Sequence, residues 1–144
     1  MDKKPITPEG QQRLRSELDR LKNVKRQEII DAISEARAHG DLKENAEYHA
    51  AREEQGLNEA RIRELEDVLG TSKVVEYKQM GVEDRVIFGS TVTIKDIEND
   101  EIKKYQIVGD AEADIENNTI SFTTPMARAL LKKEHGEFIE VHTP

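Results

Sequence analysis

Apolar residues in the N-terminal half recur at steps of three and four, the spacing of one face of an α-helix. The first series begins after Thr7-Pro8, where threonine as N-cap and proline at the first helical position are typical of a helix start, and it slips once near Arg26. Its members are Leu14, Leu18, Leu21, Val24, Ile30 and Ile33. The members of a second series are Ala46, Ala50, Leu57, Ala60, Ile62, Leu65 and Leu69. The pattern therefore predicts two long amphipathic helices.

Only a short link separates these two helices. It reads AHGDLKE at positions 38–44, with Gly40 where a helix would end in a left-handed residue and Asp41 where the next would begin. Because so short a link forces consecutive helices to run antiparallel, we expect a helical hairpin with its tip near residues 41–44.

After Leu69 the pattern changes to short alternating runs of β-forming residues, punctuated by glycines. We expect strands at 91–94, 105–108, around 120–122 and at 138–141, joined in a small antiparallel sheet. The run 125–133 has proline first and lysines last, which predicts a helix packed across this sheet. The sequence therefore predicts an α+β protein, with a helical domain at 1–76 and a globular sheet domain at 77–144.

Composition narrows the possible classes of protein. The 144 residues are 35% hydrophobic and 36% charged, which is lean for a globule and suits an elongated shape. The absence of cysteine excludes disulfides, thiolate metal sites and thiol nucleophiles. No run approaches the roughly 20 apolar residues of a membrane span, and the N-terminus lacks a signal-peptide core, so we expect a cytoplasmic protein that binds no membrane.

Charge bears on nucleic-acid binding. The net charge is −8, and both halves hold more acidic than basic residues. Because such a field repels a phosphate backbone, we expect weak or no autonomous DNA binding. Any contact with nucleic acid would need a local basic patch.

The candidate site is the predicted tip, where Asp41 and Glu44 lie three residues apart. Two carboxylates on one side of a tip could share a hard cation such as Mg²⁺. The same spacing also forms a capping box, in which aspartate accepts from a backbone N–H and glutamate reaches back, and spacing alone favours this structural interpretation. Since Mg²⁺ requires about six oxygens, a metal site here would need a partner to supply the others.

Basic and aromatic residues surround this tip. They are Arg37, Lys43, Tyr48, His49 and Arg52. Such a set could steer or stack single-stranded nucleic acid, whereas a solvated helix surface with ordinary charge pairs explains the same pattern more simply. No Ser/His/Asp signature, phosphate-binding glycine loop or HExxH motif occurs, so a stand-alone enzyme has little support.

Residues 29–55, IIDAISEARAHGDLKENAEYHAAREEQ, closely resemble the tip signature of the bacterial Gre-factor family. The resemblance continues at 85–93 (RVIFGSTVT), 105–114 (YQIVGDAEAD) and 120–131 (ISFTTPMARALL), so it covers nearly the whole chain. It implies an N-terminal antiparallel coiled coil followed by a C-terminal domain of FKBP-like fold, in which the last strand of the family is absent after Pro144.

The resemblance also implies RNA polymerase as a partner. In the family, the C-terminal domain docks on the rim of the secondary channel and the coiled coil reaches the active site. Asp41 and Glu44 would hold a Mg²⁺ ion shared with the polymerase, and Arg37 and Arg52 would approach the 3′ end of the nascent RNA. The residues implied for tip support are Gly40, Lys43, Asn45 and Tyr48, and those implied for docking are Thr124, Pro125 and Met126.

The function so implied is stimulation, in trans, of the polymerase's own cleavage of backtracked RNA, which rescues arrested complexes. The chain itself would then be no enzyme and would bind no cofactor alone. Two alternatives stay open: a non-cleaving secondary-channel regulator that inhibits RNA polymerase, and a structural coiled-coil adaptor. The short link favours a hairpin within one chain, so we expect a monomer.

Overall fold

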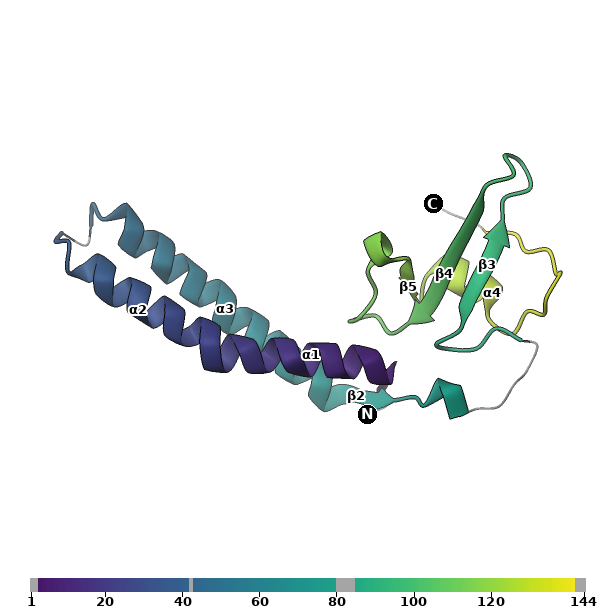
Figure 1. The fold of residues 1–144 in the computed structure, drawn as a ribbon, viewed down its shortest axis with the longest axis horizontal. Coiled ribbons are helices and arrows are strands. Elements are labelled where there is room, and N and C mark those ends of the chain that lie inside the picture. Colours follow the sequence, from purple (N-terminus) through teal and green to yellow (C-terminus); the bar gives the residue numbers. More distant parts are fainter. Residues whose placement is uncertain (1–2, 42, 80–84, 142–144) are drawn as a thin grey trace. The chain divides into compact units, whose positions relative to one another are not determined.

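The computed structural model describes residues 3–41, 43–79 and 85–141, and it divides into two compact units. The hairpin unit comprises Gln12–Gly70, and the sheet unit combines Met1–Gln11 with Thr71–Pro144. Helices and strands of both units are drawn in Figure 1. The boundary predicted between residues 76 and 77 concerns domains that fold independently, and it stays a prediction.

Three α-helices and one π-helical turn build the hairpin. They are α1 (Pro8–Arg20), the π-helical turn Leu21–Lys25, α2 (Arg26–Arg37) and α3 (Ala46–Thr71). Helices α2 and α3 lie side by side and run antiparallel, as predicted (Figure 1). The predicted start of the first helix is confirmed, because α1 begins at Pro8 and Thr7 Oγ1 accepts a hydrogen bond from the Gly10 N–H at 3.0 Å.

The π-helical turn explains the slip in the apolar series. Leu14 and Leu21 are buried and seven positions apart, and so are Ile29 and Ala36, whereas Leu21 and Ile29 are eight positions apart. Two turns of an α-helix hold about seven residues. A π-turn holds one residue more, so it returns Ile29 to the face that Leu21 occupies.

Part of the predicted apolar series is therefore wrong. Val24 and Ile30 are 47% and 45% exposed, because the π-turn moves the seam of the hairpin onto other positions. On α3, Leu57 is 66% exposed while its neighbour Asn58 is buried. The buried residues of α3 are Ala51, Asn58, Ile62 and Leu65.

Asn58 is a polar residue in an apolar seam, and it is paired. Its Nδ2 donates to the carbonyl oxygen of Leu21, on the opposite helix, at 3.4 Å. A buried amide without a partner would cost roughly 1–3 kcal/mol, so this bond favours one register of the two helices over slipped alternatives.

Two bidentate ion pairs join the helices of the hairpin. Arg26 donates to both carboxylate oxygens of Glu59, at 2.7 and 3.0 Å, and Arg61 donates to both of Glu17, at 2.8 and 2.9 Å. The hydrogen bond from Arg61 holds the pKa of Glu17 below its usual value. These contacts pair the charges of four side chains across the interface between the two arms of the hairpin.

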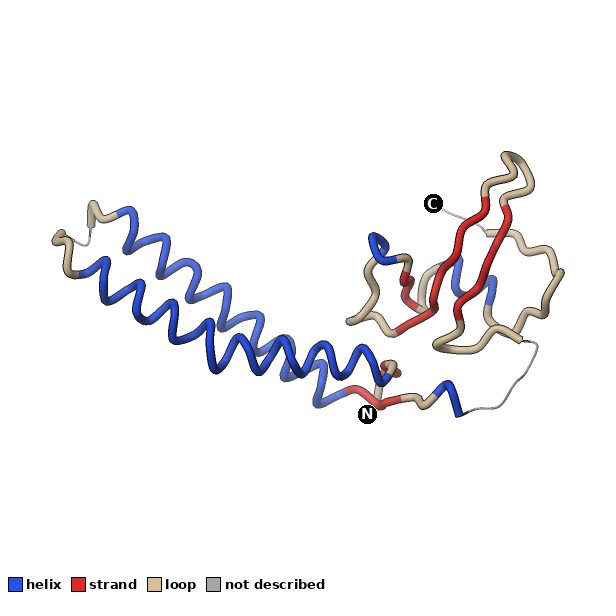
Figure 2. The backbone as a smooth tube through the Cα atoms, viewed as in Figure 1, coloured by secondary structure: helices blue, strands red, loops and turns tan. Residues whose placement is uncertain are grey.

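The sheet unit contains two separate sheets, whose strands are red in Figure 2. Strands β1 (Lys4–Ile6) and β2 (Ser72–Val74) pair in parallel. The second sheet has the order β3 (Thr91–Lys95), β4 (Ile102–Val108), β5 (Thr119–Ser121). The predicted antiparallel pairing is confirmed for β3 and β4 but wrong for β4 and β5, which pair in parallel. The cause is the connection at 109–118, which crosses over instead of turning back as a hairpin.

Helix α4 (Pro125–Leu130) covers this sheet, and the core between them is apolar. Its fully buried members are Ile107, Ile120, Ala127 and Leu130. The predicted α+β class is confirmed. The strand predicted at 138–141 is not formed, and Phe138 within it is 84% exposed.

A buried carboxylate holds the first turn of α1 within the sheet unit. Glu112 accepts hydrogen bonds from the backbone N–H groups of Thr7 and Gly109, both at 2.8 Å, and from the Thr7 hydroxyl. A Cβ at Gly10 would overlap the carboxylate of Glu112, so the glycine leaves the space that this buried group occupies. The three donors compensate the cost of burying its charge.

Candidate functional site at the hairpin tip

The tip begins where α2 ends at Arg37. The N–H of His39 donates to the carbonyl of Ala36 at 3.1 Å, which tightens the last turn. Gly40 then has φ 114°, a conformation that side-chain-bearing residues rarely adopt. The predicted glycine stop is confirmed.

The second helix starts later than the capping-box interpretation requires. Helix α3 begins at Ala46, and Asn45 is its N-cap, since Asn45 Oδ1 accepts from the Tyr48 N–H at 3.0 Å. A capping box at Asp41 and Glu44 would start the helix directly after Asp41. That interpretation, which spacing alone favoured, is therefore wrong.

The two tip carboxylates consequently lie in a loop. Asp41 Oδ1 accepts from the Lys43 N–H at 3.0 Å, and its second carboxylate oxygen has no hydrogen bond to the residues that the structure describes. The carboxylate of Glu44 makes no hydrogen bond or ion pair with any residue that the structure describes. Both side chains are exposed. Neither is used to stabilise a helix end.

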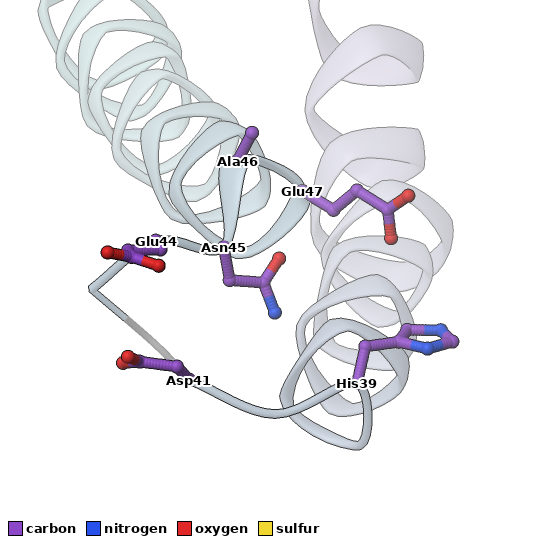
Figure 3. Close-up of a pocket in the computed structure, with 6 residues that line it drawn as sticks. All are labelled: His39, Asp41, Glu44, Asn45, Ala46 and Glu47. Atoms are coloured by element: carbon purple, nitrogen blue, oxygen red, sulfur yellow. The ribbon is translucent and has the colours of Figure 1, made fainter.

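The two carboxylates project on the same side of the tip, as Figure 3 shows. The side chains of His39 and Glu47 point to the other side of the same shallow pocket. Asp41 and Glu44 therefore face one side of the loop and Glu47 the other, and an ion shared by Asp41 and Glu44 stays a prediction.

The donor set decides which kind of metal site is chemically reasonable. Carboxylate oxygens are the hard ligands that Mg²⁺ prefers, yet two carboxylates fall short of its six-coordinate shell. Within 3–41, 43–79 and 85–141, no group of three or more His, Asp or Glu side chains is arranged to hold a metal ion. These residues therefore fit an ion whose other ligands come from a partner.

Arg37 of α2 and Arg52 of α3 line a second shallow groove, together with Ile30, Ile33, Ser34 and Gln55. Arg52 Nη1 donates to Gln55 Oε1 at 2.8 Å. Neither arginine forms an ion pair in the described part of the chain. The structure thus brings together the two predicted basic residues, and their contact with RNA stays a prediction.

The residues predicted to support the tip occupy its loop and the first turn of α3. Besides the turn at Gly40 and the cap by Asn45, the carbonyl of Lys43 lies 3.2 Å from His49 Nε2. The rings of Tyr48 and His49 meet edge to face, with centroids 5.5 Å apart. Sequence reasoning missed this contact of His49, because spacing along the chain does not show how the loop folds back.

The three residues predicted to dock on a partner lie together at the start of α4. Thr124 Oγ1 accepts from the Ala127 N–H at 3.3 Å and so caps the helix, and Pro125 is its first residue. Met126 packs against the core of the sheet. Thr124 and Met126 thus have structural roles, and docking by these residues stays a prediction.

Two family models account for nearly the whole chain. Residues 4–74 match the N-terminal model of transcription elongation factors, and residues 81–144 match the C-terminal model of GreA/GreB. The chain belongs to the GreA/GreB family of transcription elongation factors. The family resemblance carried by residues 29–55 is thereby confirmed, and the chain is a transcription elongation factor of this family.

Individual relatives agree with this assignment. The chain is 53% identical over 143 residues to transcription elongation factor GreA of Francisella tularensis subsp. novicida (strain U112), which covers 99% of the chain and 89% of that relative. The same values hold for GreA of F. tularensis subsp. tularensis (strain SCHU S4 / Schu 4). A solved structure of the transcription factor Gfh1 is similar with 30% identity and a TM-score of 0.50, over 100% of the chain and 92% of Gfh1.

No helix in the described residues is both long and apolar enough to cross a lipid bilayer.

Proposed function

We propose that this GreA/GreB-family protein stimulates the cleavage of backtracked nascent RNA by RNA polymerase. The observation that carries the proposal is the pair of carboxylates, Asp41 and Glu44, exposed on one side of a hairpin tip and not used as helix caps. The hairpin would enter the secondary channel of the polymerase, and the tip would meet its active site. The chain would act in trans and would not itself be the catalyst.

The chemistry of phosphodiester hydrolysis explains why two carboxylates would suffice. A bound Mg²⁺ ion stabilises charge on the attacking and leaving oxygens, and the polymerase would supply the ligands that this chain lacks. The role of Asp41 and Glu44 is to hold the ion by their oxygens. Arg37 and Arg52, without carboxylate partners in the described residues, would bind the anionic backbone of the extruded RNA.

Docking would be the task of the sheet unit, through the surface around Thr124, Pro125 and Met126. A net charge of −8 disfavours binding to free nucleic acid, so a protein socket would direct the factor to its site. The protein would act as a monomer in the cytoplasm, where bacterial RNA polymerase works.

Cleavage of 3′-labelled RNA in a defined backtracked complex tests the proposal. The double variant Asp41→Asn, Glu44→Gln is expected to abolish stimulated cleavage while polymerase binding persists. Glu47→Gln is the matched control, because it removes a carboxylate from the other side of the same tip (Figure 3) and should retain stimulation. A sample without polymerase should show no cleavage.

Each other outcome has a definite meaning. Retained cleavage in the double variant would remove the metal role of the pair. Wild-type protein that binds polymerase and slows elongation without stimulating cleavage would favour the inhibitory secondary-channel regulator.

A further inference from the structure

The side chain of Asn45 bonds to both helices of the hairpin at its tip. Its Nδ2 donates to the carbonyl of Ala36, in the last turn of α2, at 2.6 Å. Its Oδ1 accepts from the N–H of Tyr48, in the first turn of α3, at 3.0 Å. Among the described residues, no other tip side chain forms hydrogen bonds to both of these helix ends.

We infer that Asn45 is a positioning residue, which holds Asp41 and Glu44 in place for Mg²⁺ by linking the end of α2 to the start of α3. The inference rests on the proposed function, because it concerns the same two carboxylates. It adds the chemical reason for an amide at this position.

An amide suits this position because the two helix ends offer opposite groups. The carbonyl of Ala36, which already accepts from the His39 N–H, can accept a second hydrogen bond, and the first turn of α3 presents N–H groups that lack intrahelical acceptors. A neutral amide offers both a donor and an acceptor. Aspartate would cap α3 but has no proton to donate to Ala36, and serine would cap α3 with a side chain too short to reach Ala36 as well.

The linked helix ends enclose the loop that carries the carboxylates. Glu44 directly precedes Asn45, and Asp41 directly follows the turn at Gly40. Two backbone contacts hold Lys43, which lies between Asp41 and Glu44 in the sequence. Its N–H donates to Asp41 Oδ1 at 3.0 Å, and its carbonyl oxygen lies 3.2 Å from His49 Nε2. With the two helix ends linked and Lys43 held, the carboxylates of Asp41 and Glu44 stay on one side of the tip (Figure 3).

Fixed ligands bind an ion more tightly than mobile ones, because less conformational entropy is lost on binding. Residues that orient metal ligands through hydrogen bonds typically contribute about 10–100-fold to metal affinity or activity. Asn45 would therefore act on the Mg²⁺ requirement of the reaction and not on polymerase binding.

The hairpin offers a matched control in Asn58. This residue also donates its Nδ2 to a carbonyl on the opposite helix, that of Leu21, at 3.4 Å. It is buried in the stem and forms no hydrogen bond with the tip residues that the structure describes. Loss of Asn58 should weaken the hairpin without moving the carboxylates.

The first experiment measures the Mg²⁺ concentration for half-maximal stimulated cleavage in backtracked complexes. Asn45→Ser keeps an acceptor for the Tyr48 N–H but, because its side chain is shorter, loses the bond to Ala36, while Asn45→Ala loses both bonds. Both variants are expected to raise this concentration about 10-fold with unchanged polymerase affinity. Asn58→Ala is expected to leave it unchanged, although its thermal midpoint falls.

The second experiment needs no polymerase. Backbone ¹⁵N relaxation of the free protein reports the order of the Lys43 and Glu44 amides, and hydrogen exchange reports protection of the Tyr48 N–H. Asn45→Ser is expected to loosen Lys43 and Glu44 while Tyr48 stays protected. Asn45→Ala should lose both the order of Lys43 and Glu44 and the protection of the Tyr48 N–H, whereas Asn58→Ala should lose neither.

The outcomes separate this inference from the proposed function. If Asn45→Ser matches wild type in both its Mg²⁺ requirement and its loop order, the inference is wrong. If wild-type protein stimulates no cleavage, the proposed function fails, and the relaxation measurement alone then tests whether Asn45 holds the loop. Greater mobility of the Lys43 and Glu44 amides in Asn45→Ser would support that role, and unchanged order would overturn it.

Discussion

The stem and the tip of the hairpin differ in whether their polar side chains have partners among the described residues. In the stem, Arg26 and Arg61 are each bound by both oxygens of a glutamate, and the buried Asn58 has a carbonyl partner. At the tip, the carboxylate of Glu44 and the guanidinium of Arg37 have no ion pair among the described residues. Satisfied groups stabilise the stem, whereas groups without partners at the tip are the ones that another molecule can use.

The largest expected effect would come from the core of the stem. Ile62 is 2% exposed, and Ile62→Ala should lower the free energy of unfolding by about 2–5 kcal/mol, because it removes buried methyl groups and leaves a cavity. Urea unfolding followed by helical circular dichroism measures the loss.

The tip carboxylates should behave differently in the same measurement. The double variant Asp41→Asn, Glu44→Gln should change the free energy of unfolding by less than about 0.5 kcal/mol, since both side chains are exposed. A tip variant as unstable as Ile62→Ala would contradict the division between stem and tip.

A smaller effect distinguishes two glycines of the hairpin. A Cβ would meet no atom within 4 Å at either Gly40 or Gly56, but only Gly40 has a positive φ, of 114°. Gly40→Ala should therefore cost about 1–3 kcal/mol of backbone strain. Gly56→Ala, in the middle of α3, should stabilise by about 1 kcal/mol through its higher helix propensity.

Thermal midpoints of the two alanine variants check this prediction, which requires shifts of opposite sign. A gain in stability for Gly40→Ala would show that the turn of the tip does not depend on the conformation of this glycine.

A small effect is also expected from the ion pair between Glu17 and Arg61. The hydrogen bond from Arg61 lowers the pKa of Glu17 in the folded protein from 4.5, so the pair stabilises the fold above that pH and is lost as pH falls through the lowered pKa. Both side chains are more than one third exposed, at 37% and 38%, so solvent screening keeps the contribution below about 1 kcal/mol.

Thermal midpoints measured as a function of pH test this pair. Glu17→Gln should flatten the fall in stability below pH 4.5, and added salt should reduce the difference from wild type. An unchanged pH profile in Glu17→Gln would mean that the pair contributes nothing to stability.

The sequence by itself determined the features that local chemistry controls. The helix start at Thr7-Pro8 and the stop at Gly40 follow from capping and from backbone freedom, which involve neighbouring residues only. The long match at residues 29–55 was enough to indicate the family. It also placed Asp41 and Glu44 at a hairpin tip, and the structure shows them together on one side (Figure 3).

Only the tertiary structure decided which residues fill the seam. Periodicity alone cannot show a π-turn, and the one additional residue in that turn moves the buried position from Glu28, seven residues after Leu21, to Ile29. It also cannot distinguish a cap at Asp41 from one at Asn45, because both spacings suit a helix start. The Asn45 bond to Ala36 becomes visible only when the two helix ends are side by side.

The sheet unit shows the same limit over longer distances. Glu112 binds Thr7, which is 105 positions away, and β5 pairs in parallel with β4 because of a crossover. Such contacts depend on how distant segments meet in space. Spacing along a chain reports local periodicity and turn chemistry, whereas register, pairing direction and buried polar bonds are set by the free energy of the whole packed structure.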